Sequence, residues 1–335
     1  MILIDTTFVN SSGGINILIE IIESIPSNSR KNFLIFIDKR LKYRIKGISS
    51  FEHYFTSNLI NRQLKFKKNK KKIKVIFSLG NVPMILTGKR YQLTYNMQYF
   101  LFSQRHLTFN KTITWKIKSL VIWLFFKISN SDVAAQTRTI KSMFINQFNI
   151  NKEKVLLFPI FKQIESKIKA INNNIIFCPS SGEKYKKIEF LIKAFKIHNK
   201  KFPESKLILT IDSKYKTLID LIRKTNKKKE IITNKGLISH NEIIEIMKNG
   251  SIIVHPSIIE SFGLVLLEAS QLQSVIIAPK LPYVFDVCYP SYTYTYNNVE
   301  EFLECLNISQ KDNLIKSKSI LKSTSNKLIS YLLSK

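Results

Sequence analysis

Short apolar runs bounded by turn-forming residues recur along the whole chain, and amphipathic helical patterns lie between many of them. This alternation is typical of βα units arranged around a parallel sheet, so the chain is predicted to be an α/β protein. The runs predicted as strands are 1–4, 32–37, 74–78, 92–95, 132–136 and 154–158 in the first half, and 174–178, 206–211, 230–233, 251–255, 275–278 and 292–296 in the second.

The βα rhythm is lost between the two halves, in the segment FPIFKQIESKIKAINNN, which holds a proline and an Asn run. A chain of 335 residues is also long for one core, because domains usually hold roughly 100 to 200 residues. We therefore predict two domains, residues 1–165 and 166–315, and a carboxyl-terminal helix at 316–335 that packs back toward the amino-terminal domain. The apolar positions of that tail are Ile320, Leu321, Leu328, Ile329 and Leu332.

The segment HPSIIESFGLVLLEA, residues 255–269, places two glutamates, Glu260 and Glu268, on either side of the apolar run 262–267. A carboxylate in such surroundings needs a partner, because an unpaired buried charge is costly. The pattern predicts a strand, a loop and a buried helix, whose amino terminus lies where α/β sheets bind ligands and where amides favour an anion. Gly263 leaves the backbone at that turn open to an approaching group.

Both glutamates are therefore predicted to face one pocket, where the hydroxyl groups of a sugar would supply the missing donors. A simpler alternative needs no ligand: Glu260 would cap the helix and Glu268 would meet a neighbouring lysine. The residues of this segment alone leave both interpretations open.

The same region resembles a known signature. The stretch PSIIESFGLVLLEASQLQSVIIAPKLPY is similar to the pattern of the family 4 (group 1) retaining glycosyltransferases, and FCPSSGEKYKKIEFLIKAF (177–195) and SSGGINILIEII (11–22) resemble two further loops of that family. The defining positions of the pattern are occupied by Glu260, Phe262, Gly263, Glu268 and Ala269. The resemblance implies the GT-B fold, in which two Rossmann-like parallel-sheet domains face an interdomain cleft, the first binding an acceptor and the second a nucleotide sugar.

Within this resemblance, Glu260 and Lys186 are the candidate catalytic residues. Glu260 falls where the family contacts donor-sugar hydroxyls near the reacting carbon, and Lys186 falls on the lysine that meets the diphosphate. Glu268 falls on the glutamate that holds the nucleotide ribose. A lysine beside amides and a helix dipole can stabilise a departing diphosphate without a metal. The other donor-binding residues that the resemblance implies are Phe262, Gly263, Leu264, Lys184, Ser181, Gly13 and Gly14.

The sequence departs from the family pattern at some of these positions. Ser181 stands where a common arginine lies five residues before the lysine, so either Lys184 or Lys187 substitutes for it or the loop works without it. Gln273 lies in a segment that replaces the usual small-Gly-x-Pro, and these changes leave an inactive, degenerate transferase open as an alternative. A histidine of the family's acceptor domain has no clear counterpart, and Asn96 is the acceptor-side candidate near its position.

Metal and cofactor signatures are missing from the sequence. No two aspartates are separated by a single residue, so the metal-chelating D-x-D of another large glycosyltransferase class is not present, nor is a P-loop. The cysteines Cys178, Cys288 and Cys305 form no zinc motif and indicate a reducing cytosol. We interpret His255, which precedes a proline, as a strand-end residue rather than a catalyst. We expect no metal and no cofactor, because a nucleotide sugar is a substrate.

The formal charge of +30 indicates an anionic partner, and only 8 of the 53 basic residues are arginine. Residues 62–74 (RQLKFKKNKKKIK) form a dense lysine run, and residues 115–129 (WKIKSLVIWLFFKIS) mix aromatic residues with lysines. These segments could bind an anionic membrane surface or single-stranded nucleic acid, or form a solvated loop and a buried helix. The membrane is favoured, because members of the resembled family extend lipid-linked glycans, and no nucleic acid partner is expected.

The leading hypothesis is a retaining glycosyltransferase that moves a sugar from a nucleotide sugar to a saccharide or lipid-linked saccharide acceptor, for bacterial O-antigen, capsule or a related glycan. A two-domain nucleotide-sugar epimerase and a basic nucleic-acid-binding protein are the alternatives. The amino terminus MILIDTTFV does not resemble a signal peptide, and no apolar run approaches the roughly 20 residues that span a bilayer. We therefore expect a cytoplasmic protein, with peripheral attachment to the inner face of the cell membrane as an option.

Overall fold

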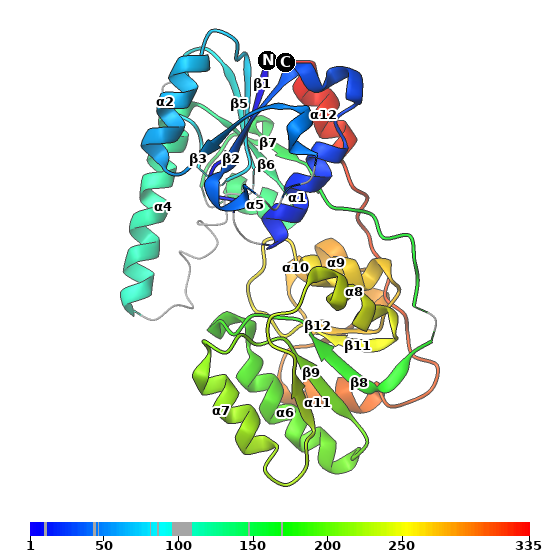
Figure 1. Cartoon of the computed structure of the whole chain (residues 1–335). Helices are drawn as coiled ribbons and strands as arrows, with labels where there is room; N and C mark the ends of the chain where they lie inside the picture. The colour runs from blue at the N-terminus through cyan, green and yellow to red at the C-terminus, as the bar shows by residue number, and fades with distance from the viewer. Residues whose placement is uncertain are drawn as a thin grey trace. The chain divides into compact units, whose positions relative to one another are not determined.

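The computed structural model describes residues 1–9, 12–42, 45, 47–80, 82–85, 87–95, 109–146, 148–168 and 170–335. The chain divides into two compact units (Figure 1). Unit 1 comprises Met1–Lys162 and Lys322–Lys335, and unit 2 comprises Gln163–Leu321. Each unit contains a parallel sheet covered by helices, so the prediction of an α/β protein with two parallel-sheet domains is confirmed.

The sheet of unit 1 is parallel and has seven strands in the order β3-β2-β1-β4-β5-β6-β7. The strands are β1 (Ile2–Thr6), β2 (Phe33–Asp38), β3 (Glu52–Thr56), β4 (Val75–Ser78), β5 (Tyr91–Tyr95), β6 (Asp132–Ala135) and β7 (Val155–Leu157). β1, β2 and β4 are buried at every position, as expected where helices cover both faces. The carboxyl ends of these strands lie at one edge, where α/β sheets carry ligand-binding loops.

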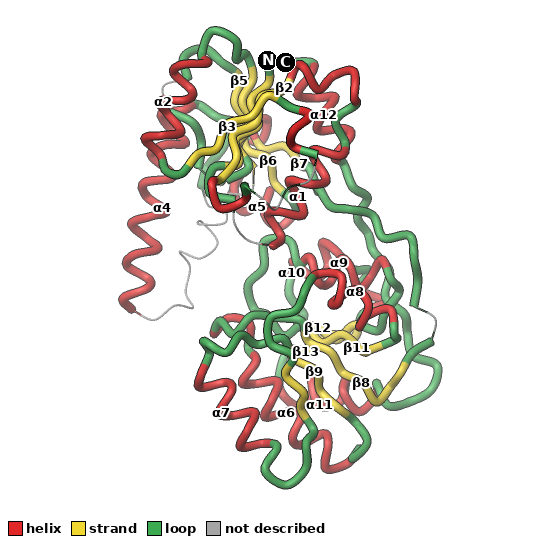
Figure 2. The backbone as a smooth tube through the Cα atoms, in the orientation of Figure 1, coloured by secondary structure: helices red, strands yellow, loops and turns green. Residues whose placement is uncertain are grey.

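Helices cover the two faces of this sheet (Figure 2). They are α1 (Ser12–Glu23), α2 (Leu59–Asn69), α4 (Phe109–Ser129), α5 (Arg138–Asn146) and α12 (Ser325–Leu333), with short 3₁₀ helices at Ser27–Asn32, Lys39–Leu41, Ile48–Ser50 and Lys152–Lys154. α1 and α12 pack together, and Leu18 and Leu328 share one core cluster with Ile4. Phe66 of α2 and Phe126 of α4 belong to clusters on the opposite face of the sheet.

The sheet of unit 2 is also parallel, with six strands in the order β10-β9-β8-β11-β12-β13. The strands are β8 (Asn172–Cys178), β9 (Lys206–Leu209), β10 (Ile232–Asn234), β11 (Ser251–Val254), β12 (Ile276–Pro279) and β13 (Tyr294–Tyr296). The helices are α6 (Ile188–Lys201), α7 (Lys216–Thr225), α8 (His240–Lys248), α9 (Leu264–Gln271), α10 (Pro282–Val287) and α11 (Val299–Ile308), with 3₁₀ helices at Lys184–Lys186 and Pro290–Tyr292. β11 lies at the centre of this sheet, between β8 and β12, so the loop that follows it starts from a fully buried strand.

Two details differ from the sequence prediction. β3 was not predicted, because this edge strand has only its last residue buried and shows no continuous apolar run. The tail is helical only over Ser325–Leu333, so the helix expected across 316–335 is wrong in its first part. Ile320 instead donates its backbone N–H to Val287 at 2.9 Å, and Tyr289 donates to Lys318, which ties the segment to the residues around the end of α10.

Across the described residues, no helix is both long and apolar enough to cross a bilayer. α4, with 21 residues, has sufficient length, but lysines interrupt its apolar sequence.

Candidate functional site

The loop between β11 and α9 begins as a continuation of the strand and ends in a left-handed turn. The His255 backbone N–H donates to the Ile277 carbonyl at 3.0 Å and so extends the pairing of β11 with β12. Gly263 adopts φ 71° and ψ 51° immediately before α9, a conformation that favours glycine. No side chain caps α9, so its first amide groups and the positive end of its dipole can receive an anion.

A second loop, between β8 and α6, is shaped by a glycine packed against a tyrosine ring. Gly182 passes so close to Tyr215 that a Cβ added there would lie 2.4 Å from the ring carbon Cγ. The Tyr215 hydroxyl donates to Glu183, and the 3₁₀ helix that carries Lys186 follows directly. α6 then buries the stripe predicted from the sequence, Ile188, Leu191, Ile192 and Phe195. This packing fixes the start of α6 and thereby positions Lys186.

The two loops meet at one carboxylate. Lys186 Nζ forms an ion pair with Glu260 Oε1, and His255 Nε2 lies 3.0 Å from the same oxygen. The backbone N–H of Ile258 also donates to the Tyr185 carbonyl at 2.9 Å, which joins the loops through the main chain. The side chains of Lys186 and Glu260 are each only 15% exposed, so the pair is largely removed from water.

The charges of this pair stabilise each other. Burial opposes ionisation of Glu260, but the charge of Lys186 and the hydrogen bond from His255 outweigh it and hold the pKa at about 2. Burial likewise disfavours the Lys186 ammonium, but Glu260 outweighs this effect and raises the pKa of Lys186. At neutral pH the site therefore contains a carboxylate and an ammonium rather than two neutral groups.

Tyr283, in α10, packs against the loop between β11 and α9. Its hydroxyl donates to the Ser257 carbonyl, and its ring meets the His255 imidazole edge-on with ring centres 6.3 Å apart. Burial raises the pKa of Tyr283 above its usual value, so the hydroxyl stays protonated and keeps donating. His255 is thus held in place by packing as well as by its contact with Glu260.

The second glutamate has a different partner. Glu268 lies in α9, is 6% exposed, and its Oε1 is 2.7 Å from Nε2 of His240. His240 is the first residue of α8, which is stabilised by a capping box between Ser239 and Glu242. The hydrogen bond to Glu268 raises the pKa of His240, although burial opposes the shift. No described contact joins Glu268 to Glu260, so their convergence on one ligand stays a prediction.

Comparison with family models finds a match in the region that contains the site. Residues 160–292 match the family model described as glycosyl transferases group 1. Residues 160–292 therefore form a group 1 glycosyltransferase region. The matched region contains both loops of the site together with β11, α9 and α10. No curated protein matches this glycosyltransferase in a sequence search.

Solved structures resemble the whole glycosyltransferase chain. Anabaena Alr3699/HepE, in complex with UDP and glucose, is 15% identical, with a TM-score of 0.69 and 99% of each chain covered. Sucrose-phosphate synthase of Thermosynechococcus elongatus is 14% identical, with a TM-score of 0.71 and coverage of 91% of this chain and 88% of the other. The lipopolysaccharide outer core galactosyltransferase WaaB is 14% identical, with a TM-score of 0.63 and coverage of 92% and 89%. At these identities the likeness concerns the fold, and it confirms the predicted GT-B class of two Rossmann-like domains.

The structure brings together some of the residues predicted for this glycosyltransferase site. Lys186 meets Glu260, and Gly263 forms the left-handed turn before Leu264, the first residue of α9; Phe262 is buried beside that turn. The alternative in which Glu260 caps the helix and Glu268 pairs with a lysine does not match the structure. No side chain caps α9, and the observed partner of Glu268 is a histidine.

Other predicted positions lie apart from this cluster. Lys184 and Lys187 are exposed, and the Ser181 side chain hydrogen-bonds Glu183 rather than any described group of the Lys186 cluster. Gly13 and Gly14 lie in the first turn of α1, in unit 1. Asn96 lies outside the residues that the structure describes.

Two histidines of the site were not predicted to take part. His255 does continue its strand, as interpreted, but its ring also reaches Glu260. His240 was missed, although the sequence SHNE around it signals a helix start that could bring a side chain near the sheet edge. Among the described residues, no group of three or more His, Cys, Asp or Glu could hold a metal ion.

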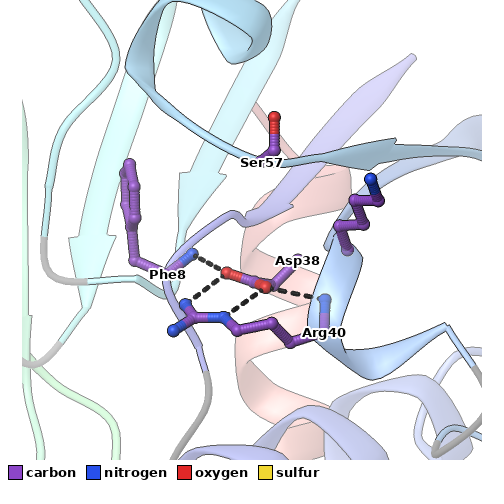
Figure 3. Close-up of a pocket in the computed structure, with 5 residues that line it drawn as sticks. Phe8, Asp38, Arg40 and Ser57 are labelled. Atoms are coloured by element: carbon purple, nitrogen blue, oxygen red, sulfur yellow. Dashed lines mark hydrogen bonds and ion pairs between the residues drawn. The ribbon is translucent and has the colours of Figure 1, made fainter.

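Unit 1 of the glycosyltransferase has an open pocket of about 670 Å³, lined by Phe8, Asp38, Lys39, Arg40 and Ser57 (Figure 3). These residues lie at or just after the carboxyl ends of β1, β2 and β3. Asp38 accepts hydrogen bonds from the Phe8 backbone N–H at 3.1 Å and from the Arg40 side chain at 2.7 and 2.8 Å. Phe8 has φ 105°, a costly conformation for a bulky residue, and such strain is common at binding sites.

Proposed function

We propose that this protein is a retaining glycosyltransferase that transfers a hexosyl group from a nucleotide sugar to a saccharide acceptor. The observation that carries the proposal is the buried ion pair between Lys186 and Glu260, held by two loops where β11 leads into the uncapped amino terminus of α9. Anion-binding amides, an ammonium group and a carboxylate then lie in one group 1 glycosyltransferase region.

The diphosphate and the ribose of the donor would bind different parts of the site. The amides at Gly263 and Leu264 and the Lys186 ammonium bind the diphosphate. Together they can stabilise its charge without a metal ion. Glu268 accepts hydrogen bonds from the ribose hydroxyls. We also propose, from the family resemblance, a diphosphate-binding role for Gly13 and Gly14 of α1. Alr3699/HepE was crystallised with UDP and glucose, which supports a nucleoside diphosphate sugar as the donor class.

Ionisation restricts what each group does in the reaction. Glu260, with a pKa of about 2, is a carboxylate at neutral pH, so it accepts hydrogen bonds from donor-sugar hydroxyls and stabilises positive charge that develops at the anomeric carbon. Lys186 stays protonated and stabilises the departing diphosphate. The acceptor hydroxyl attacks the face that the diphosphate leaves, and its proton passes to a diphosphate oxygen, so configuration is retained without a separate base.

The acceptor is proposed to bind unit 1. The pocket at Phe8 offers an aromatic ring for a sugar face, and Lys39 and Arg40 offer charge for an anionic group on the acceptor. We propose a saccharide linked to a membrane lipid, from O-antigen, capsule or related glycan synthesis on the cytoplasmic side of the cell membrane. The fold similarity to WaaB, a lipopolysaccharide galactosyltransferase, is in keeping with that acceptor class.

The donor is tested by thermal shift of the full chain with UDP-, GDP- and ADP-sugars and the free nucleotides. One nucleotide class should raise the melting temperature, because a ligand bound by the native state stabilises it. Lys186→Met should abolish the rise and reduce transfer roughly 100-fold or more, the usual effect of losing one group that stabilises developing charge.

Lys186→Arg, which keeps the charge, should recover part of the shift. The matched control is Lys193→Met in α6, which breaks an exposed ion pair with Glu189 away from the site. A wild-type melting temperature that no nucleotide changes, or an unaltered shift in Lys186→Met, would contradict the proposed site.

A further inference from the structure

Large aliphatic side chains are exposed along α2 and α4 of unit 1. On α4 they recur at helical spacing, so they form one stripe, and the stripe ends at Ile128, which is 66% exposed. On α2 the most exposed is Ile60, at 73%. The exposed set comprises Leu59, Ile60 and Leu64 on α2, and Ile117, Leu120, Val121, Leu124 and Ile128 on α4.

Both helices cover the same face of the sheet. Phe66 of α2 packs in a cluster with Ile76 of β4, and Phe126 of α4 packs in a cluster with Val133 of β6. The strand register places Ile76 opposite Gln92 and Val133 opposite Thr94, and positions two apart on a strand share a face. The outward sides of α2 and α4 therefore point away from the sheet in the same sense, and the two helices appear as neighbours in Figure 1.

The turn at Val82 links the two helices. Arg62 of α2 donates to the Val82 carbonyl at 2.8 Å, while the Val82 side chain packs against the cluster that contains Ile122 of α4. We call the outward sides of the two helices, with the eight exposed aliphatic residues named above, the α2/α4 face.

The charge around this face has a single sign. From His53 to Ser131 the sequence contains no Asp or Glu and 15 Lys or Arg. Exposed lysines lie at the end of α2 and directly after it: Lys67, Lys68, Lys70, Lys71, Lys72 and Lys74. Exposed aliphatic side chains beside a cluster of lysines match the chemistry of an anionic lipid surface, with acyl chains below phosphate headgroups.

We propose that the α2/α4 face docks on an anionic phospholipid bilayer, with the aliphatic stripe of α4 in the interfacial layer and the lysines of α2 on the headgroups. Nucleic acid fits less well, because the large apolar side chains that the structure describes as exposed on these two helices are aliphatic, and single strands bind by stacking on aromatic rings. A second copy of this chain would bring the same positive charge to the contact, which opposes self-association. This inference deepens the acceptor side of the proposed function, since a lipid-linked acceptor lies in such a bilayer.

Vesicle flotation of the full chain tests the proposal, with phosphatidylglycerol-containing vesicles compared with pure phosphatidylcholine. Wild-type protein should float with the anionic vesicles and less with the neutral ones. Lys67→Gln/Lys68→Gln/Lys71→Gln should weaken binding roughly 100-fold at low salt, because each lysine near an anionic surface contributes roughly fivefold. Ile117→Ser/Leu124→Ser should weaken binding that persists at high salt, where screening has removed the lysine contribution.

Matched controls change the same residue types in unit 2. Lys224→Gln/Lys227→Gln/Lys228→Gln removes three exposed charges, and Ile197→Ser/Ile315→Ser replaces two exposed aliphatic residues; both should float like wild type. The nucleotide-dependent melting shift of each variant shows whether it is folded, and it separates a failed docking surface from a failed donor site. Flotation that neither α2 nor α4 variant weakens would overturn the proposal, as would binding to an RNA oligonucleotide without vesicle binding, or a dimer that these variants dissociate.

Discussion

Glu260, whose pKa is held at about 2, is ionised at neutral pH and is therefore no proton donor; we expect it to act through its charge and its acceptor oxygens. Glu260→Gln keeps the shape and removes both the charge and the partner of Lys186. We expect turnover to fall roughly 100-fold to 1,000-fold while nucleotide affinity changes much less, because the lost interaction belongs to the transition state. Initial rates and nucleotide titrations measure the two effects separately.

The control for this substitution is Glu189→Gln in α6, which removes an exposed carboxylate that also pairs with a lysine. It should leave both parameters unchanged. An equal loss of nucleotide affinity and turnover in Glu260→Gln would instead indicate that the residue serves donor binding alone.

The contact between His240 and Glu268 makes one part of unit 2 sensitive to pH. Because Glu268 raises the pKa of His240, protonation of His240 stabilises the fold. This stability is fully present below the pKa of an unfolded histidine, about 6.5, and is lost as pH rises through the higher folded value. The melting temperature of wild type should therefore exceed that of His240→Gln in mildly acidic buffer, and the two should converge at alkaline pH.

Glu268→Gln provides the complementary variant, because it removes the negative partner and should abolish the same pH-dependent difference. A difference between wild type and His240→Gln that stays constant from acidic to alkaline buffer would show that the histidine acts by packing and not by charge.

At the scale of elements, the turn that starts α9 depends on one glycine. Gly263 has φ 71°, so Gly263→Ala should destabilise the protein by about 1 to 2 kcal/mol through backbone strain and also lower nucleotide affinity by moving the first amides of α9. Gly47→Ala is the matched control, because Gly47 has φ 79° in unit 1 and open space around it. Urea unfolding should show a similar loss in both variants, whereas only Gly263→Ala should bind nucleotide more weakly.

Most strands could be predicted from the sequence because buried parallel strands are continuous apolar runs, as in β2 and β11. β3 could not, since an edge strand need bury only part of its length. The segment before α12 was predicted to be helical because Ile320 and Leu321 fit an amphipathic helix. An extended segment can carry the same apolar residues, and its backbone hydrogen bonds to the end of α10, which the sequence does not reveal, favour the extended form.

The site residues were likewise predictable only where a local sequence pattern marks them. Glu260 and Lys186 each stand in a recognisable local pattern, and the structure joins them in an ion pair that the sequence analysis did not predict. His240 approaches Glu268 from a different βα unit, 28 residues away in the chain, and that proximity depends on how α8 and α9 pack. Local spacing carries no information about such a contact.

At the scale of the molecule, each of the two units is stabilised by its own hydrophobic core. Leu328 is fully buried in the core of unit 1, and Leu306 in that of unit 2. Each change to alanine should cost about 2 to 5 kcal/mol. In a calorimetric scan, Leu328→Ala should lower one transition and Leu306→Ala the other, and nucleotide should raise chiefly the transition that Leu306→Ala affects, because most of the proposed donor contacts lie in unit 2. A single transition lowered equally by both variants would show that the units unfold together.

The return of the chain to unit 1 after Leu321 also affects how the protein is made. Unit 2 is one continuous stretch and can fold as soon as it leaves the ribosome, whereas unit 1 lacks α12 until the residues that follow unit 2 have been translated. Unit 1 is therefore begun before unit 2 and completed after it, and a nascent chain interrupted before Ser325 would leave the core of unit 1 without the apolar side chains of α12.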